Sequence, residues 1–107
     1  MSGAKFTSHV PETLTELQQK KARCLEIIGG KAETHAKKEC PVRTGNLRNS
    51  ITHQQVDENT EAIGTNVYYG PYVELGTRSS KAHPFLRPAA ENHTEEYREV
   101  IDRELKG

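Results

Sequence analysis

The sequence lacks tryptophan, has few aromatic residues of any kind and carries no excess of either charge. Aromatic side chains make up 6% of its 107 residues and hydrophobic ones 33%, which predicts one small domain with a thin core. Such domains often gain stability from partner subunits, so the composition favours an assembly protein. The 15 basic and 15 acidic residues cancel. Because proteins that bind phosphate backbones normally carry a basic excess, this balance argues against nucleic acid as the partner.

Long apolar runs are missing too. No stretch approaches the roughly 18–20 residues of a membrane-spanning helix, and residues 1–10 lack the apolar segment of a signal peptide. We therefore expect no membrane partner and a protein that stays in the cytoplasm where it is made. Cys24 and Cys40 fit that compartment, since their spacing within one predicted helix places them about 24 Å apart, beyond disulfide reach. We predict two reduced thiols that the fold does not require.

Signatures of catalysis and cofactor binding are also absent. The histidines fall on separate predicted elements, and no histidine or cysteine pair has the spacing of zinc ligands. The sequence contains no nucleophile elbow, no glycine-rich phosphate loop and no cysteine-enzyme motif. We therefore expect a protein that is not an enzyme and that uses no metal, no cofactor and no small-molecule substrate.

One carboxylate lies in an apolar setting, Glu74 between Tyr72, Val73 and Leu75. An unpaired charge there would be costly, so we predict that Glu74 is at least half buried and paired with an arginine. The candidates are Arg43, Arg48, Arg78 and Arg87, of which Arg48 and Arg87 are favoured.

The first half of the chain predicts one long helix. Residues 1–12 are polar and end near Pro11, which we interpret as a flexible arm before a single domain of residues 13–107. Thr13 and Glu16 have the spacing of a capping box, and apolar residues then follow at helical spacing until Pro41 ends the helix. Gly29-Gly30 interrupts the pattern at about 1 kcal/mol per glycine relative to alanine. Either the helix kinks there or another backbone packs closely, and we favour one continuous helix.

The second half predicts strands and further helices. Residues 51–56 and 60–65 alternate like strands around a turn at 57–59, so they form a hairpin. Pro71 opens a short helix that Gly76 closes, and residues 78–82 have the composition of a mobile loop. Apolar residues at helical spacing after Pro88 predict a single C-terminal helix. The fold class is therefore α+β, with a small antiparallel β-sheet packed on one face by the long N-terminal helix and the C-terminal helix.

Three segments take the interpretation further. They read Cys-Pro-Val-Arg-Thr-Gly-Asn-Leu-Arg-Asn-Ser-Ile at 40–51, Tyr-Gly-Pro-Tyr-Val-Glu-Leu-Gly-Thr at 69–77 and His-Pro-Phe-Leu-Arg-Pro-Ala at 83–89. In this order they resemble the siphophage tail-component family named after the tenth gene product of phage Hong Kong 97, to which phage lambda's minor tail protein Z is related in role. The residues that match the family motifs are Pro41, Thr44, Gly45, Leu47, Arg48, Ser50, Tyr69, Tyr72, Val73, Glu74, Gly76, Thr77, Pro84, Phe85, Leu86, Arg87 and Pro88.

The resemblance implies a structural virion protein of a tailed phage or prophage. Such a protein completes the tail and acts in head–tail joining at the neck, without catalysis or cofactor, after assembly in the host bacterial cytoplasm. Its implied partners are further copies of itself in a ring-forming oligomer and the neighbouring neck and tail proteins. The loop Arg78, Ser79, Ser80 and Lys81 would contact a neighbouring subunit, and the core would come mostly from Tyr69, Tyr72, Val73, Phe85 and Leu86. The alternative is a small nucleic-acid-binding module that uses the basic loop Arg78–His83.

Overall fold

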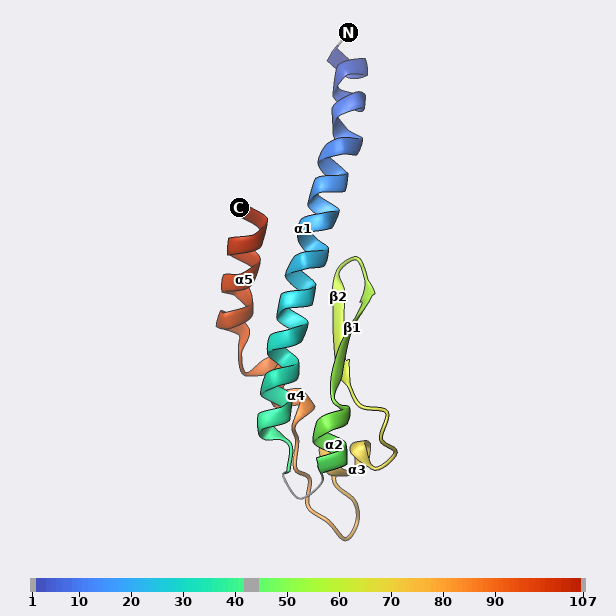
Figure 1. The fold of residues 1–107 in the computed structure, drawn as a ribbon, viewed down its shortest axis with the longest axis vertical. Helices are drawn as coiled ribbons and strands as arrows, with labels where there is room; N and C mark the ends of the chain where they lie inside the picture. The colour runs from blue at the N-terminus through green and yellow to red at the C-terminus, as the bar shows by residue number, and fades with distance from the viewer. Residues whose placement is uncertain (1, 42–44, 107) are drawn as a thin grey trace.

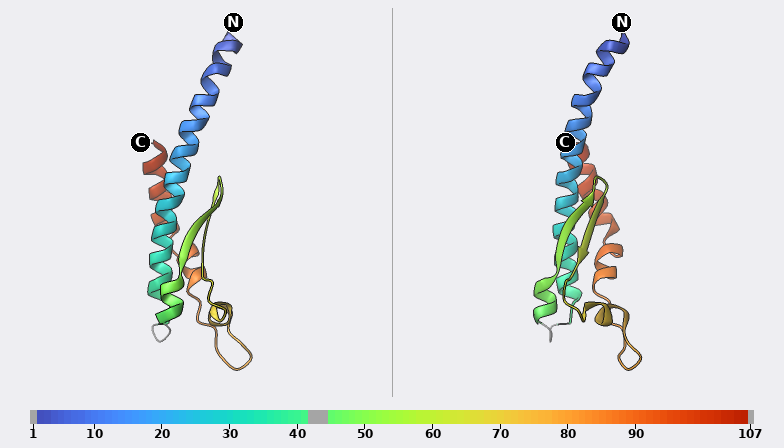
Figure 2. Two further views of the ribbon diagram at one scale, coloured as in Figure 1. Left: turned by 45° about the vertical axis from the view of Figure 1, so that its right-hand side comes forward. Right: turned by 90° about the vertical axis from the view of Figure 1, so that its right-hand side faces the viewer.

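The molecule is a three-layered rod built around one long helix. The computed structural model describes residues 2–41 and 45–106, with side chains from Thr15 onward. The principal extents are 70 × 24 × 21 Å. Helix α1 (Ser2–Glu39) is the middle layer, with the β-hairpin on one side and the C-terminal helix α5 (Thr94–Lys106) on the other, as Figures 1 and 2 show. The α+β prediction is confirmed.

Helix α1 begins earlier than the sequence predicted. Its backbone is helical from Ser2, so the start at Thr13 is wrong. Pro11 was interpreted as a stop, but an internal proline raises the free energy of a helix by about 3 kcal/mol and does not forbid one. Whether residues 1–12 act as an arm separate from the domain stays a prediction. The helix is continuous through Gly29 and Gly30, as favoured, and no described helix combines the length and apolarity of a membrane span.

Strands β1 (Thr52–Asp57) and β2 (Thr60–Gly64) form the predicted antiparallel hairpin, which is the only sheet in the described residues. Thr52 pairs with Gly64 at its base, and the register shifts near the turn. There the Asn59 N–H donates to Asp57 Oδ1 over 2.9 Å and fixes the reversal. Both strands pack on α1, as an isolated two-stranded ribbon must pack on something to be stable.

The core lies at the end of the rod that holds the C-terminal part of α1 and three short helices. These are α2 (Gly45–Ser50), α3 (Gly70–Leu75) and α4 (Leu86–Glu91), which gather around the C-terminal part of α1 in Figure 1. Their shared cluster is small, as the composition predicted. Its buried members are Ala36, Cys40, Leu47, Ile51, Phe85 and Ala89.

The predicted C-terminal helix is two helices, which corrects the sequence analysis. The Asn92 N–H donates to the Pro88 carbonyl and closes α4, and the Thr94 hydroxyl donates to the Glu91 carbonyl at the start of α5. A second correction concerns placement, because α5 packs mainly on α1 and not on the sheet. The reason is its apolar stripe, which buries Val100 and brings Ile101 beside Cys24 of α1.

Candidate functional site

The family motifs converge on the loop end of the rod, where Glu74 joins two of them. Glu74 lies in the last turn of α3, and its carboxylate faces the first residues of α4. Oε1 accepts the backbone N–H groups of Phe85 over 2.9 Å and Leu86 over 2.8 Å, and Oε2 accepts that of Arg87 over 3.1 Å. These amides belong to the start of a helix, where backbone donors have no partner within the helix. A single side chain therefore fastens α3 to α4.

The electrostatics of Glu74 follow from this geometry. Burial raises the pKa of the carboxyl, but the three backbone donors and the nearby Arg87 together outweigh it, so the pKa lies below its ordinary value. The predicted burial is confirmed, since the residue is mostly shielded from solvent. The favoured arginine partners Arg48 and Arg87 are wrong, because among the described residues the carboxylate makes no ion pair. Backbone amides satisfy it instead, and Arg87 pairs with Glu91 over 3.0 Å. Arg43 lies outside the described residues.

The loop that Glu74 closes, residues 76–83, is held by its own hydrogen bonds. Thr77 N–H donates to the Ser80 carbonyl over 2.9 Å, and Ser80 N–H donates to Thr77 Oγ1 over 3.0 Å. His83 N–H donates to the Val73 carbonyl over 2.8 Å at the base. Gly76 has a φ of 81°, and a Cβ there would lie 2.7 Å from the Ala82 nitrogen. Whether the loop is mobile, as expected from composition, stays a prediction.

An apolar surface flanks this loop. Tyr68 is 82% exposed, Tyr72 58% and Leu75 77%, although all three lie in or beside the most apolar stretch of the sequence. Tyr72 was predicted to fill the core, and this is wrong. Tyr69 and Val73, one helical turn apart, pack on the core side, which leaves Tyr72 on the open side of α3. A cavity of about 440 Å³ opens here, lined by Pro41, Tyr69, Tyr72, Val73, Thr77, Ser80, Lys81 and His83.

The remaining motif residues divide between the core and the surface. Leu47 and Phe85 are fully buried, and Leu86 packs against them. Ser50 donates its hydroxyl to the Leu47 carbonyl over 2.7 Å and contacts the Thr65 hydroxyl, which secures α2 beside the end of β2. The motif residues left on or near the surface are Gly45, Arg48, Thr77, Pro84, Arg87 and Pro88. Thr44 lies outside the described residues.

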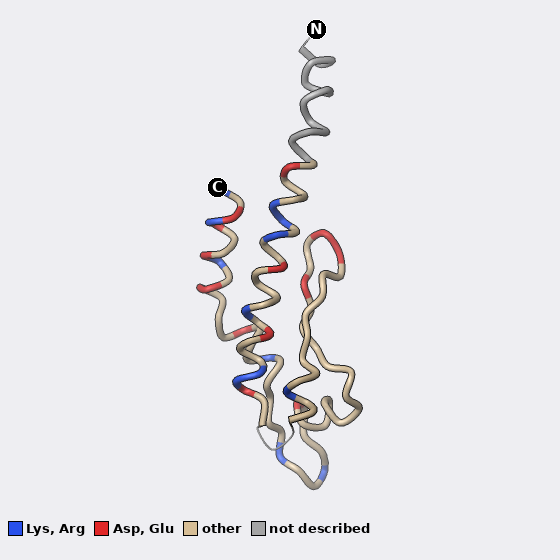
Figure 3. Tube along the Cα trace, viewed as in Figure 1, with Lys and Arg blue, Asp and Glu red and all other residues tan. Residues whose placement is uncertain are grey.

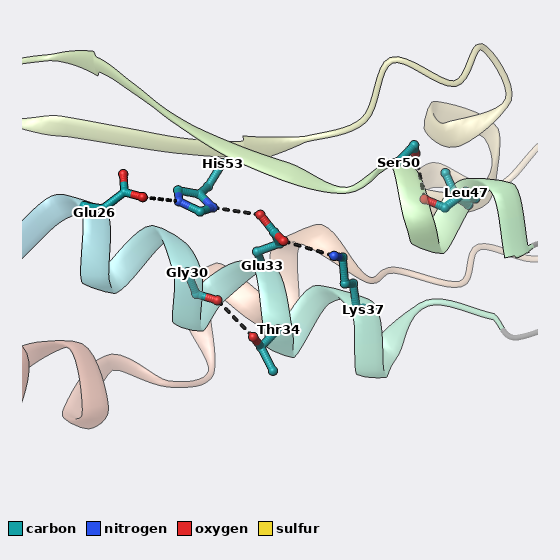
Figure 4. A network of polar contacts seen from close by, with 8 residues as sticks. All are labelled: Glu26, Gly30, Glu33, Thr34, Lys37, Leu47, Ser50 and His53. Carbon is teal, nitrogen blue, oxygen red and sulfur yellow. Dashed lines mark hydrogen bonds and ion pairs between the residues drawn. The ribbon is translucent and has the colours of Figure 1, made fainter.

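Two polar clusters on α1 were missed by the sequence analysis. On the hairpin side, His53 contacts Glu33 through Nδ1 over 2.7 Å and Glu26 through Nε2 over 3.0 Å, as Figure 4 shows. These hydrogen bonds to Glu26 and Glu33 raise the pKa of His53. The Glu61 carboxyl lies nearby, and its pKa is raised by burial and then by Glu26. The side chains come from elements far apart in sequence, so no local spacing could have revealed them.

The second cluster joins α1 to the C-terminal segment. The rings of His35 and His93 stack with centroids 3.5 Å apart, and His35 Nε2 lies 3.1 Å from Glu96 Oε2. This hydrogen bond with His35 lowers the pKa of Glu96 against the opposing effect of burial. Both clusters hold three side chains whose ligand atoms lie within 4.8 Å of one another, which is a donor arrangement that can accept a metal ion.

The fold is a small elongated rod, and the family motifs gather at one end of it. A family model described as "Bacteriophage HK97-gp10, putative tail-component" matches residues 4–76, and the chain belongs to this family. The match covers α1, α2, the hairpin and α3, including the first motif and all but the last residue of the second. The motif at 83–89 follows the matched residues. A search of curated proteins and a search of solved structures each gave no match.

Proposed function

We propose that this tail component is a tail-completion protein of the neck, which acts in head–tail joining as a structural part of the virion. It forms a ring with further copies of itself at the end of the tail and contacts neighbouring neck and tail proteins. It carries out no catalysis. The family membership supports the phage setting, and the surface around α3 supports an assembly role.

The observation that carries the proposal is the exposure of Tyr68, Tyr72 and Leu75. Large apolar side chains gathered on a soluble module mark a surface for a partner. The surface adjoins the junction of α3 and α4 that Glu74 bridges and the loop that its own hydrogen bonds connect. Two copies that meet only through this small surface associate weakly. A ring template that presents many such sites at once makes the association strong.

The test is made in the phage that carries the gene. Deletion of the gene should leave filled heads and full-length tails that fail to join, as seen by electron microscopy. The double substitution Tyr72→Ser with Leu75→Ser should give the same defect, because both side chains are exposed and their loss leaves the core unchanged. Normal infectious particles after the deletion, or an earlier block with empty or unassembled heads, would show that the proposal is wrong.

A nucleic-acid-binding module is the second candidate. Arg78 and Lys81 are exposed in the loop, and Lys37, Lys38 and Arg48 surround a separate surface cavity of about 460 Å³. Figure 3 shows basic residues at this end of the rod, acidic residues at the hairpin turn and residues of both signs along α5. Binding of random-sequence duplex DNA that weakens steeply with salt would favour this function. The net charge of zero speaks against it.

A further inference from the structure

The hairpin-side cluster on α1 has the chemistry of a cation site. It combines one imidazole and two carboxylates from three elements: Glu26 of α1, His53 of β1 and Glu61 of β2. Their ligand atoms lie within 4.8 Å of one another. Glu26 is 70% exposed and His53 20%, so the cluster opens to solvent on the side of Glu26. An ion has a path of entry from that side.

Glu61 supplies an independent observation. Both of its carboxylate oxygens expose less than 1 Å² and neither has a hydrogen-bond partner. A buried carboxylate without a partner is costly, and native proteins almost always pair such a group. The absence of a side chain at Gly29 makes room for it, because a Cβ there would collide with Glu61 Oε2 and lie 2.7 Å from His53 Cδ2. The fold thus places an unsatisfied carboxylate beside a histidine, in a space that the Cβ of any residue other than glycine at position 29 would fill.

We propose that Glu26, His53 and Glu61 bind a divalent transition-metal ion, with Zn²⁺ the best match, and that this ion fastens the hairpin to α1. Zn²⁺ accepts imidazole nitrogen and carboxylate oxygen at about 2.0–2.2 Å. Three protein ligands leave one coordination position for water.

The surroundings of His53 suit a metal ligand. Nδ1 lies 2.7 Å from Glu33 Oε1, and Lys37 Nζ in turn lies 3.0 Å from Glu33 Oε2 (Figure 4). A carboxylate that accepts the Nδ1 proton fixes the imidazole tautomer and directs Nε2 toward the metal. In this structure Nε2 faces Glu26. Metal binding displaces the proton from Nε2, while Nδ1–H continues to donate to Glu33. Glu33 is therefore a positioning residue and not a ligand.

The cluster of His35, His93 and Glu96 provides the internal comparison. Its two imidazoles stack with an interplanar angle of 3°, so their nitrogen lone pairs lie in two parallel planes and do not converge on one point. Its carboxylate already accepts from His35, and Lys31 lies 3.8 Å away. The hairpin-side cluster is the better site because its Glu61 carboxylate is unpaired.

The experiment uses untagged, EDTA-stripped protein titrated with Zn²⁺ by calorimetry and with Co²⁺ by visible absorption. Wild-type protein should bind one ion and gain thermal stability with it. Glu61→Gln and Glu26→Gln should each weaken binding at least tenfold and abolish the thermal shift. Glu33→Gln should weaken it about 10–100-fold as an outer-shell change. His93→Gln is the matched control and should bind like wild type.

Two further outcomes make the test decisive. Without metal, Glu61→Gln should melt at a higher temperature than wild type at neutral pH, because a neutral amide replaces an unpaired buried charge. The proposal is overturned if Glu61→Gln and Glu26→Gln bind Zn²⁺ as tightly as wild type. It is equally overturned if His93→Gln alone abolishes binding, since the ion then belongs to the other cluster. Neither result bears on the role in the phage neck.

Discussion

The carboxylate of Glu61 lies against Gly29, in the space that the Cβ of any other residue would occupy. Gly30, the next residue of α1, has no atom from outside its own stretch of helix backbone within 4 Å of its missing Cβ. Adjacent glycines in one helix therefore face different surroundings, and only the first is needed for packing. This explains the first glycine of the pair that interrupts the apolar pattern, while nothing in the structure explains the second.

Substitution of the two glycines by alanine should separate these roles. Gly30→Ala should raise the free energy of unfolding by up to about 1 kcal/mol, since alanine is the better helix former and nothing obstructs it. Gly29→Ala should not raise the free energy of unfolding in this way, because Glu61 and the His53 ring must both move to make room for the new Cβ. Chemical denaturation of the metal-free proteins measures the difference. Equal stabilisation by both substitutions would contradict the close contact at Gly29.

Removal of the Glu74 charge should detach α4 from α3. Glu74→Gln should lower the free energy of unfolding by about 2–3 kcal/mol, because three backbone donors lose an ionised acceptor. Glu91→Gln is the control, and loss of its exposed ion pair with Arg87 should change stability by less than about 0.5 kcal/mol. Similar effects of the two substitutions in urea denaturation would show that the backbone contacts contribute little.

The effect of Glu74 should depend on pH in a defined direction. Its pKa is lowered in the fold, so its contribution is present above the ordinary carboxyl pKa of about 4.3 and is lost as pH falls through the folded value. The gap in stability between wild type and Glu74→Gln should therefore be constant near neutral pH and narrow on acidification. A gap that widens at low pH would contradict the lowered pKa.

Substitution of two apolar residues in neighbouring motifs should affect different properties, stability in one case and self-association in the other. Phe85 is fully buried, and Phe85→Ala should lower stability by about 3–5 kcal/mol through lost burial and a cavity. Leu75 is 77% exposed, and Leu75→Ala should change stability by less than about 0.5 kcal/mol while reducing self-association at high concentration. Thermal melting and analytical ultracentrifugation measure the two properties. A large loss of stability in Leu75→Ala would mean that this residue serves the fold and not a partner.

The two free cysteines should be unreactive toward thiol reagents in the native protein. Both are buried, and burial raises the pKa of each thiol, so little thiolate is available. Cys40 belongs to the core cluster, so Cys40→Ser should cost more than Cys40→Ala by about 1 kcal/mol or more, because a hydroxyl needs a partner there. Rapid modification of native protein by a disulfide reagent would contradict the burial. Whether the fold can dispense with both thiols stays a prediction.

Local patterns predicted the elements of this fold well. The continuous helix before Pro41, the hairpin and the short helix between Pro71 and Gly76 follow from apolar spacing and turn residues that act on near neighbours. The division of the last helix at Asn92 was not visible, because the apolar spacing continues across the break. Patterns of this kind report which residues can share a face, and not whether the backbone between them stays helical.

The sequence did not predict the contacts between segments that are distant along the chain. We expected the side chain of an arginine to pair with Glu74. The actual partners are backbone amides of another motif. Backbone donors carry no sequence signature. The stacking of His35 on His93 and the closeness of His53 to Glu61 were hidden for a related reason, since tertiary folding alone brings these side chains together. The resemblance placed Tyr72 in the core, whereas the structure leaves this side chain 58% exposed.

The central position of α1 has a consequence for how the sequence can change during evolution. Glu26, Gly29 and Glu33 lie on the face of α1 toward the hairpin, while Lys31 and His35 lie toward Glu96 of α5. The hairpin and α5 each pack on α1 from opposite sides. Substitutions in the hairpin should therefore covary with one set of α1 positions and those in α5 with the other. Homologous chains should show two groups of coupled positions that alternate along one helix and vary independently of each other.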